Sequence, residues 1–304
     1  MSKIELSGEN LTIDKLEQIA LQKYECVLSA SARKKMQTSR EYIEKRLQAG
    51  EVMYGVNTGF GAFSKVRISN EDIVQLQKNL IRSHCSGVGE PFTQSETRAI
   101  MALRANALAR GHSGIRVAVV DKILEFLNAD VLPVIPCQGS VGASGDLAPL
   151  SHLALALMGE GEVFNKLGVP TPAAEVLKEK KIAPLELQAK EGLSMINGCQ
   201  VMTAVGLLTA ARARDLLWLL DLGGAMSLEA LRGSRGPFDK LISASRPHPG
   251  EGETARNILK LLGETSEIAE SHRDCDRVQD AYSLRCMPAV HGAAKNTLWR
   301  TIET

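Results

Sequence analysis

The sequence predicts a mainly α-helical fold, in which an amino-terminal domain with glycine-rich loops precedes the first part of a long central helical bundle. Apolar residues recur at helical spacing along most of the chain, whereas strand-like segments are few and short. The helical segments also begin and end with residues that favour helix termini. We expect the two parts to occupy residues 1–200 and 201–304.

The first two predicted helices lie between residues 69 and 111. Ser69 and Asp72 favour a helix start, and apolar residues follow at positions 73, 76 and 80. Thr93 and Glu96, three residues apart, have the spacing of a capping box at the start of the next helix. That helix is expected to end at Gly111, because glycine is favoured just past helix C-termini.

Further helices are predicted in the rest of the chain. Residues 117–127 repeat apolar side chains at helical spacing, and Asp146 begins a helix that ends at Gly159. Residues 201–222 are apolar on most faces, which is typical of a helix buried inside a bundle. Residues 290–304 form a helical pattern without a stop signal, which indicates the front part of a longer protein.

Extended structure is expected at only a few places. Residues 131–135 and 162–164 are candidates for short strands, and the prolines in the first of them limit its pairing. Turn residues between positions 159 and 172 predict a small hairpin.

Composition and charge favour a soluble enzyme and exclude several other classes. The 304 residues are 44% hydrophobic and 23% charged, as in ordinary globular proteins. Lys plus Arg number 36 and Asp plus Glu number 35, whereas a nucleic-acid surface or a polybasic membrane anchor needs a basic excess. The aromatic content of 4% also argues against a stacking platform for single strands.

Cysteine spacing and the apolar segments indicate a cytoplasmic protein. The six cysteines are scattered, and no two have the spacing of a thiolate zinc site. Acidic residues among the first twenty positions argue against a signal peptide. The most apolar long segment, 201–226, is interrupted by charges, whereas a membrane-spanning helix needs about 18 apolar residues. We therefore expect neither a nucleic-acid nor a membrane partner.

Residues 139–146 (GSVGASGD) carry the chemistry that we predict, and three interpretations compete. A phosphate-binding loop would need a lysine after the last glycine, and Asp146 places negative charge where the anion would bind. A serine-hydrolase elbow needs glycine two residues after Ser144, where this sequence has Asp146.

The third interpretation is ring closure between the nitrogen of Gly145 and the carbonyl carbon of Ala143. Glycine permits the close approach, and loss of two waters, the second from Ser144, leaves an electrophilic methylidene carbon. Asp146 is placed to move protons during this cyclisation. An Ala-Ser-Gly tripeptide considered alone, however, is most often a plain turn.

Together with other segments, this tripeptide resembles the signature of the aromatic amino acid ammonia-lyases, which build a methylidene-imidazolone group (MIO) from Ala-Ser-Gly. The matching segments, in chain order, are 54–61 (YGVNTGFG), 83–84 (SH), 86–89 (SGVG), 139–161, 196–198 (ING), 246–250 (RPHPG) and 279–286 (QDAYSLRC). The resemblance implies that Ala143, Ser144 and Gly145 form this group autocatalytically, without an external cofactor or a metal. It also implies self-association into a tetramer of long helices, with active sites that are each built from three subunits.

The resemblance assigns the removal of ammonia to a small catalytic set. The amine is a poor leaving group, so Ser144 is implied to supply the electrophile that alkylates it. The β-hydrogen is weakly acidic, so Tyr54 is implied to be its base, in surroundings that favour the phenolate. Ala143, Gly145 and Asp146 complete the set. Without the resemblance, Tyr54 would be a half-buried aromatic beside a turn.

The resemblance also implies a substrate-binding set, which consists of Ser83, His84, Asn197, Gln279, Tyr282 and Arg285. Arg285 can hold a carboxylate with both arms of its guanidinium, and Tyr282, one helical turn earlier, can share its face. The Ser-His pair at 83–84 resembles the histidine-specific branch, since the His84 imidazole can exchange hydrogen bonds with a substrate imidazole. The implied reaction converts L-histidine to urocanate and ammonia.

Several of these residues have plainer alternatives. Arg285 could form an ordinary ion pair, Asn197 could be a turn residue, and His84 could be satisfied near a helix end. His152, on an apolar helix, is expected to be packed core.

Two alternative functions stay open. Chains of the family continue well past the length of this one and contribute a phenylalanine and a glutamate to the histidine pocket. This chain could therefore be a catalytically incompetent fragment or a companion subunit. An aminomutase would use the same electrophile and return the amine to the β-carbon. Cys199, where threonine commonly follows the Asn-Gly pair, is a smaller departure from the family pattern.

Overall fold

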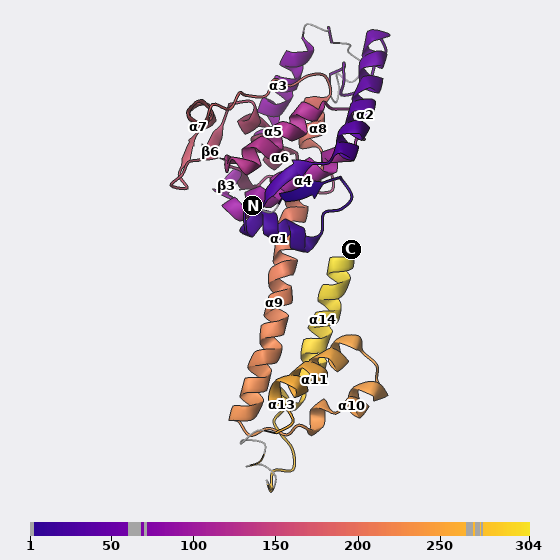
Figure 1. The fold of residues 1–304 in the computed structure, drawn as a ribbon, viewed down its shortest axis with the longest axis vertical. Coiled ribbons are helices and arrows are strands. Elements are labelled where there is room, and N and C mark those ends of the chain that lie inside the picture. The colour runs from indigo at the N-terminus through magenta and orange to yellow at the C-terminus, as the bar shows by residue number, and fades with distance from the viewer. Residues whose placement is uncertain (1–2, 60–67, 70–71, 266–269, 271–273, 275) are drawn as a thin grey trace. The chain divides into compact units, whose positions relative to one another are not determined.

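The structure is a computed structural model that describes residues 3–59, 68–69, 72–265, 270, 274 and 276–304. Its elements are mainly helices (Figure 1), which confirms the predicted fold class. The chain divides into two compact units, residues 1–208 and 209–304, which are described separately. The division falls inside the longest helix, α9 (Gln200–Ala230).

The first unit contains eight helices that lie wholly within it, seven short strands and the start of α9 among its described residues. Its helices are α1 (Ile13–Leu21), α2 (Ala30–Gln48), α3 (Ile73–His84), α4 (Gln94–Ala109), α5 (Val117–Asn128), α6 (Leu147–Leu157), α7 (Ala173–Lys180) and α8 (Glu191–Ile196). Its strands are β1 (Lys3–Leu6), β2 (Glu25–Leu28), β3 (Val88–Pro91), β4 (Leu132–Pro133), β5 (Pro136–Gln138), β6 (Glu162–Phe164) and β7 (Pro170–Pro172).

Helix α4 lies at the centre of the first unit's core and packs against α1, α2 and α5. Its residues Ile100, Met101 and Leu108 are almost completely buried. The predicted capping box is present: Thr93 Oγ1 accepts the N–H of Glu96 at 3.3 Å, and the Glu96 carboxylate accepts the N–H of Thr93 at 2.9 Å. Local sequence therefore starts the helix, and burial of its apolar faces holds it in place.

Two small sheets bring distant segments of the first unit together. Strand β3 pairs antiparallel with β5, with Val88 opposite Gln138. This pairing places the segment that follows His84 beside the segment that precedes residue 139. Strands β6 and β7 form the hairpin predicted between residues 159 and 172, and β4 pairs with β6.

The second unit consists of the later part of α9 and several shorter helices. These are the 3₁₀ helix η2 (Gly236–Phe238), α10 (Lys240–Ser245), α11 (Pro249–Leu262), α13 (Tyr282–Arg285) and α14 (Met287–Glu303). Helix α14 includes residues 290–303 of the helical pattern predicted at residues 290–304. It packs closely on α11, because Gly250 and Gly292 have no side chains where the two backbones meet. A Cβ atom at either position would collide with the other helix.

Buried charges join three helices of the second unit. The carboxylate of Asp221 on α9 is 3.0 Å from Nδ1 of His291 and 2.5 Å from Nζ of Lys295, both on α14. Asn257 of α11 donates to the same carboxylate at 2.8 Å. Asp221 and Lys295 are 1% and 3% exposed, so this cluster is part of the unit's interior.

The prediction that residues 201–222 are buried is wrong for the middle of α9. Ala204 and Leu208 are buried, but Leu216, Trp218 and Leu219 are each more than half exposed. A helix that is apolar on most faces needs neighbours on most faces, and the described part of the chain covers only some of them. An apolar stripe therefore remains on the surface.

Candidate active site

The predicted ring-forming tripeptide lies in a tight turn. The N–H of Ser144 donates to the carbonyl of Val141 at 2.7 Å, and the N–H of Gly145 donates to that of Gly142 at 3.2 Å. Gly145 has a φ of +102°, a conformation that favours glycine. Ala143 and Ser144 are exposed, whereas Gly145 is buried. The turn thus presents the serine side chain to solvent and holds the glycine nitrogen inside.

Asp146 fastens this turn to the beginning of α9. Its side chain is completely buried, and Oδ2 accepts the N–H of Val201 at 2.8 Å and that of Met202 at 3.1 Å. Ser140 donates its hydroxyl to Oδ1 at 2.5 Å. Asp146 also precedes α6, as predicted, but makes no side-chain cap there. Its carboxylate instead accepts hydrogen bonds from N–H groups at the N-terminus of α9 that have no partner within that helix, a place where negative charge is favoured.

Asn197 lies against the turn from the other side. It ends α8, and its Oδ1 is 2.9 Å from the place that a Cβ atom would take on Gly145. The N–H of Asp146 donates to the carbonyl of Gly198 at 2.7 Å, and Cys199 Sγ donates to the carbonyl of Gly142 at 3.3 Å. The structure therefore brings together two motifs that are about fifty residues apart in the sequence.

Arg104 of α4 is a residue of this site that the sequence analysis missed. Its guanidinium, 4% exposed, donates to the carbonyls of Ser194 and Asn197 and to Oε1 of Gln200. Burial lowers the pKa of Arg104 to about 10, although the Asp146 carboxylate and the Cys199 thiol raise it. The available signal was an arginine within the apolar run that forms the core of α4.

Ser83 and His84 form the last turn of α3. Nδ1 of His84 lies 2.8 Å from the carbonyl of Leu80, and since a carbonyl can only accept, Nδ1 carries the proton. In the neutral form of the ring, Nε2 is then the acceptor. The segment that follows reaches the ring-forming loop, because a Cβ atom on Gly139 would lie 3.3 Å from Cα of Gly87.

Tyr54 lies near the opposite end of α3. Its side chain is 61% exposed, and the neighbouring Val56 packs with Ile73, the first residue of that helix. Ile73 and His84 are about 16 Å apart along the helix axis, from a rise of roughly 1.5 Å per residue. Within the described part of the first unit, the tripeptide, Asp146 and Asn197 are in contact, whereas Tyr54 belongs to a separate loop. The last two residues of its motif, 60 and 61, lie outside the described residues.

Gln279, Tyr282 and Arg285 belong to the second unit and form a group of their own. Gln279 and Arg285 line a cavity of about 430 Å³ together with Ser234 and Glu251. The Arg285 guanidinium lies 4.4 Å from the centre of the Tyr282 ring, so the two side chains share a face of α13. Tyr282 is 74% exposed, and Nε of Arg285 is buried without a hydrogen-bond partner. This group therefore offers an open aromatic face and an unsatisfied cationic donor.

His152 is half-buried on α6. Its Nε2 is buried without a hydrogen-bond partner, and burial lowers the pKa of the imidazole, which favours the neutral ring. It packs against Gly87, where a Cβ atom would lie 3.1 Å from Nε2. The ring thus supports the loop that follows His84.

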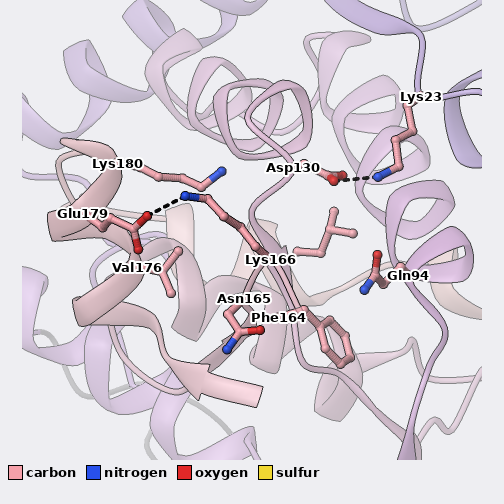
Figure 2. A pocket seen from close by; sticks show the side chains of 10 residues that line it. Lys23, Gln94, Asp130, Phe164, Asn165, Lys166, Val176, Glu179 and Lys180 are labelled. Carbon is pink, nitrogen blue, oxygen red and sulfur yellow. Dashed lines mark hydrogen bonds and ion pairs between the residues drawn. The ribbon is translucent and has the colours of Figure 1, made fainter. Parts of the chain in front are cut away.

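A further pocket of the first unit contains charged residues but none of the predicted site residues among those that line it. Figure 2 shows this cavity of about 160 Å³, in which Lys23 pairs with Asp130 at 2.7 Å and Lys166 pairs with Glu179 at 2.9 Å. Because these cations are paired with neighbouring carboxylates, the pocket is a weaker candidate for substrate binding.

The sequence predicts neither a metal site nor a membrane partner. No cluster of three or more His, Cys, Asp or Glu side chains that could hold a metal ion occurs in the described ranges. One described stretch, Glu191–Ala230, is long and apolar enough to cross a membrane, a property that core helices of soluble proteins share.

Comparison with known proteins identifies a family. The family model described as aromatic amino acid lyase matches residues 11–304. A histidine ammonia-lyase from Sorangium cellulosum is 50% identical over 296 residues, which are 96% of this chain and 57% of that protein. A histidine ammonia-lyase from Anaeromyxobacter sp. is 47% identical over 97% of this chain and 60% of that protein. The chain thus spans less than two thirds of the length of these curated relatives.

Solved structures are similar over the whole described fold. Histidine ammonia-lyase from Trypanosoma cruzi has a TM-score of 0.88 and 39% identity, covering 99% of this chain and 55% of that one. Tyrosine aminomutase from Streptomyces globisporus has a TM-score of 0.91 and 37% identity, covering 99% and 60%.

Proposed function

The chain belongs to the aromatic amino acid lyase family, and on that basis we propose that it is part of a histidine ammonia-lyase, which converts L-histidine to urocanate and ammonia. The observation that carries this proposal is the turn of Ala143, Ser144 and Gly145, closed against Asn197 and fastened to α9 through Asp146. Identities of 47–50% to histidine ammonia-lyases support the substrate.

The residues of the turn fit formation of a methylidene-imidazolone. For ring closure, the Gly145 nitrogen bonds to the Ala143 carbonyl carbon. The oxygen of that carbonyl leaves as water with the N–H protons of Gly145 and Ser144, and a double bond forms between the carbon and the Ser144 nitrogen. The Ser144 hydroxyl then leaves as a second water with the proton on its Cα. The φ of +102° at Gly145 and the absence of space for a Cβ atom both favour glycine at the attacking position. The group so formed would supply an electrophile for the substrate amine.

The other residues bind and orient the substrate, hold the ring-forming turn or remove a proton. Arg285 holds the carboxylate, with Tyr282 against its guanidinium, and Gln279 lines the same cavity. Nε2 of His84 accepts a hydrogen bond from the substrate imidazole, while Ser83 lies beside it. Asn197 holds the ring-forming turn, and Tyr54 removes the β-proton.

Self-association is part of the proposal. The exposed apolar stripe of α9, which includes Leu216, Trp218 and Leu219, supports a partner helix there, and we propose the family's tetramer. We also propose a cytoplasmic location, which the similarity to histidine ammonia-lyases supports.

Intact mass of the purified 304-residue chain tests the prosthetic group. The proposal expects a mass two waters below that of the unmodified sequence, and Ser144→Ala should lose no water from its side chain. Absorbance of urocanate, with L-histidine as the substrate, then tests turnover. An unmodified wild-type mass, or full activity in Ser144→Ala, would overturn the assignment of the electrophile.

Assays on the same purified chain also test two other functions. The similarity to tyrosine aminomutase favours amine return to the β-carbon as the second candidate, and chromatography for a β-amino acid product decides it. A chain that forms the ring but yields neither product is an incomplete subunit, which its partial coverage of the relatives makes the third candidate.

A further inference from the structure

Arg104 lies beneath the turn that joins α8 to α9. One arm of its guanidinium, Nη2, donates to the carbonyl of Asn197 at 3.3 Å and to that of Ser194. The other arm, Nη1, donates to Oε1 of Gln200 at 2.5 Å. One side chain thus ties the end of α8 to the first residue of α9.

The same turn is the surface against which the ring-forming tripeptide rests. Asn197 limits the space beside Gly145, and Gly198 accepts the N–H of Asp146. A Cβ atom on Gly198 would collide with Nη1 of Arg104, so the guanidinium lies directly on this backbone. Any displacement of Arg104 therefore moves the groups that touch Gly145 and Asp146.

We propose that Arg104 is a positioning residue for formation of the prosthetic group: it holds residues 194–200 where Gly145 can reach the Ala143 carbonyl. This inference rests on the proposed function, because it concerns the ring closure described there. Arg104 touches none of the reacting atoms and acts through the turn that contains Asn197 and Gly198.

Arginine suits this position for two reasons. Its planar fork can donate to several oxygens at fixed angles, which a lysine cannot do. It also remains charged when buried, and its charge attracts the buried carboxylate of Asp146. The fork fixes the geometry of the turn, and the charge offsets the cost of burying that carboxylate.

Arg98 provides a matched control on the same helix. It is 2% exposed and donates to the carbonyls of Ile19 and Leu127 and to the Asp130 carboxylate. Its burial and its kind of partners therefore match those of Arg104, but these partners are not part of the ring-forming turn. Loss of either arginine should destabilise the core, and only loss of Arg104 should disturb the tripeptide.

The experiment compares the wild-type chain with Arg104→Met, Arg104→Lys, Arg98→Met and Gly198→Ala. Intact mass over time measures loss of the two waters, and hydrogen exchange measures protection of residues 145–146 and 197–202. We expect ring formation at least tenfold slower in Arg104→Met and Gly198→Ala, intermediate in Arg104→Lys, and at the wild-type rate in Arg98→Met. Hydrogen exchange at residues 145–146 and 197–202 should be faster in Arg104→Met and in Gly198→Ala than in the wild-type chain.

Four results would overturn the inference. The first is ring formation at the wild-type rate in Arg104→Met, and the second is equal slowing in Arg98→Met, which would indicate general destabilisation. If Arg104→Met does not fold, wild-type rates in Gly198→Ala would overturn it instead. A wild-type chain without the mass deficit would refute the proposed function; unchanged exchange at residues 197–202 in Arg104→Met would then refute the positioning role separately.

Discussion

Oδ1 of Asn197 lies 2.9 Å from the position that a Cβ atom would occupy on Gly145. Because Gly145 also has a φ of +102°, Gly145→Ala would combine a collision with backbone strain of roughly 1–3 kcal/mol. We expect that variant to be less stable by about that amount and to keep the mass of an unclosed peptide. Urea unfolding and intact mass measure the two effects.

Gly206→Ala is the matched control for this substitution. Gly206 is inside α9 with no atom within 4 Å of its Cβ position, so alanine should raise stability by about 0.5–1 kcal/mol. Ring closure in Gly145→Ala at the wild-type rate would show that the close approach of Asn197 is not limiting.

Tyr54→Phe removes the hydroxyl that we assign as the base and leaves the turn of Asp146 untouched. General-base catalysis contributes roughly 10²–10⁴-fold, so kcat for histidine should fall by that factor. Intact mass should still be two waters low. Tyr42→Phe, another exposed tyrosine of the first unit, should have no effect. A wild-type kcat in Tyr54→Phe would remove this residue from the mechanism.

Arg285→Lys retains the charge but loses the planar fork that pairs with a carboxylate. Hydrogen bonds to charged groups are worth about 1.5–3 kcal/mol, so KM for histidine should rise roughly 10–100-fold. Arg300→Lys, on the exposed side of α14, is the control and should leave KM unchanged. Steady-state kinetics distinguish the two, and an unaltered KM in Arg285→Lys would exclude carboxylate binding by this residue.

Asp221 should make the second unit sensitive to acid. Burial alone would raise the pKa of Asp221. Hydrogen bonds from His291, Lys295 and Asn257 and the charge of Lys295 together lower it by more than burial raises it, so the pKa lies below its ordinary value. A depressed pKa stabilises the fold above the pKa of the unfolded chain, about 4, and this contribution is lost as the pH falls through the folded value.

Asp221→Asn tests this dependence. Breaking a buried ion pair costs about 3–5 kcal/mol at pH 7, and the difference from wild type should shrink below about pH 4. Asp215→Asn, with an exposed carboxylate, should cost less than about 1 kcal/mol. Urea unfolding between pH 7 and pH 3 gives both numbers. A difference that stays constant with pH would contradict the assigned role of the carboxylate.

Local signals in the sequence predicted much of the fold. Thr93 and Glu96 are sufficient to predict the start of α4, because both partners of a capping box lie within one turn. The parallel pair β1 and β2 was missed, since each strand has four residues and its partner lies 22 positions away in the chain. Short strands of that kind have no periodic pattern that is long enough to detect.

The site was predictable only in part for the same reason. The motif of residues 139–146 predicts a turn, but the bond from Val201 to Asp146 joins groups 55 residues apart. The only local signal for Arg104 is its place in the apolar run of α4, since its partners lie far along the chain, at residues 194–200. The burial of the middle of α9 was predicted wrongly, because an apolar helix sequence indicates that other elements must cover it but not whether this chain supplies those elements.

The bond between Asp146 and Val201 has a consequence for heating. Helix ends fray at lower temperatures than helix middles, and the tripeptide is attached to the end of a 31-residue helix. At this end of α9, Val201 and Ala204 are almost completely buried, so core packing and the bond to Asp146 both resist fraying. Loss of the Asp146 carboxylate is therefore expected to let this helix end, and the turn attached to it, open at a lower temperature than the rest of the fold.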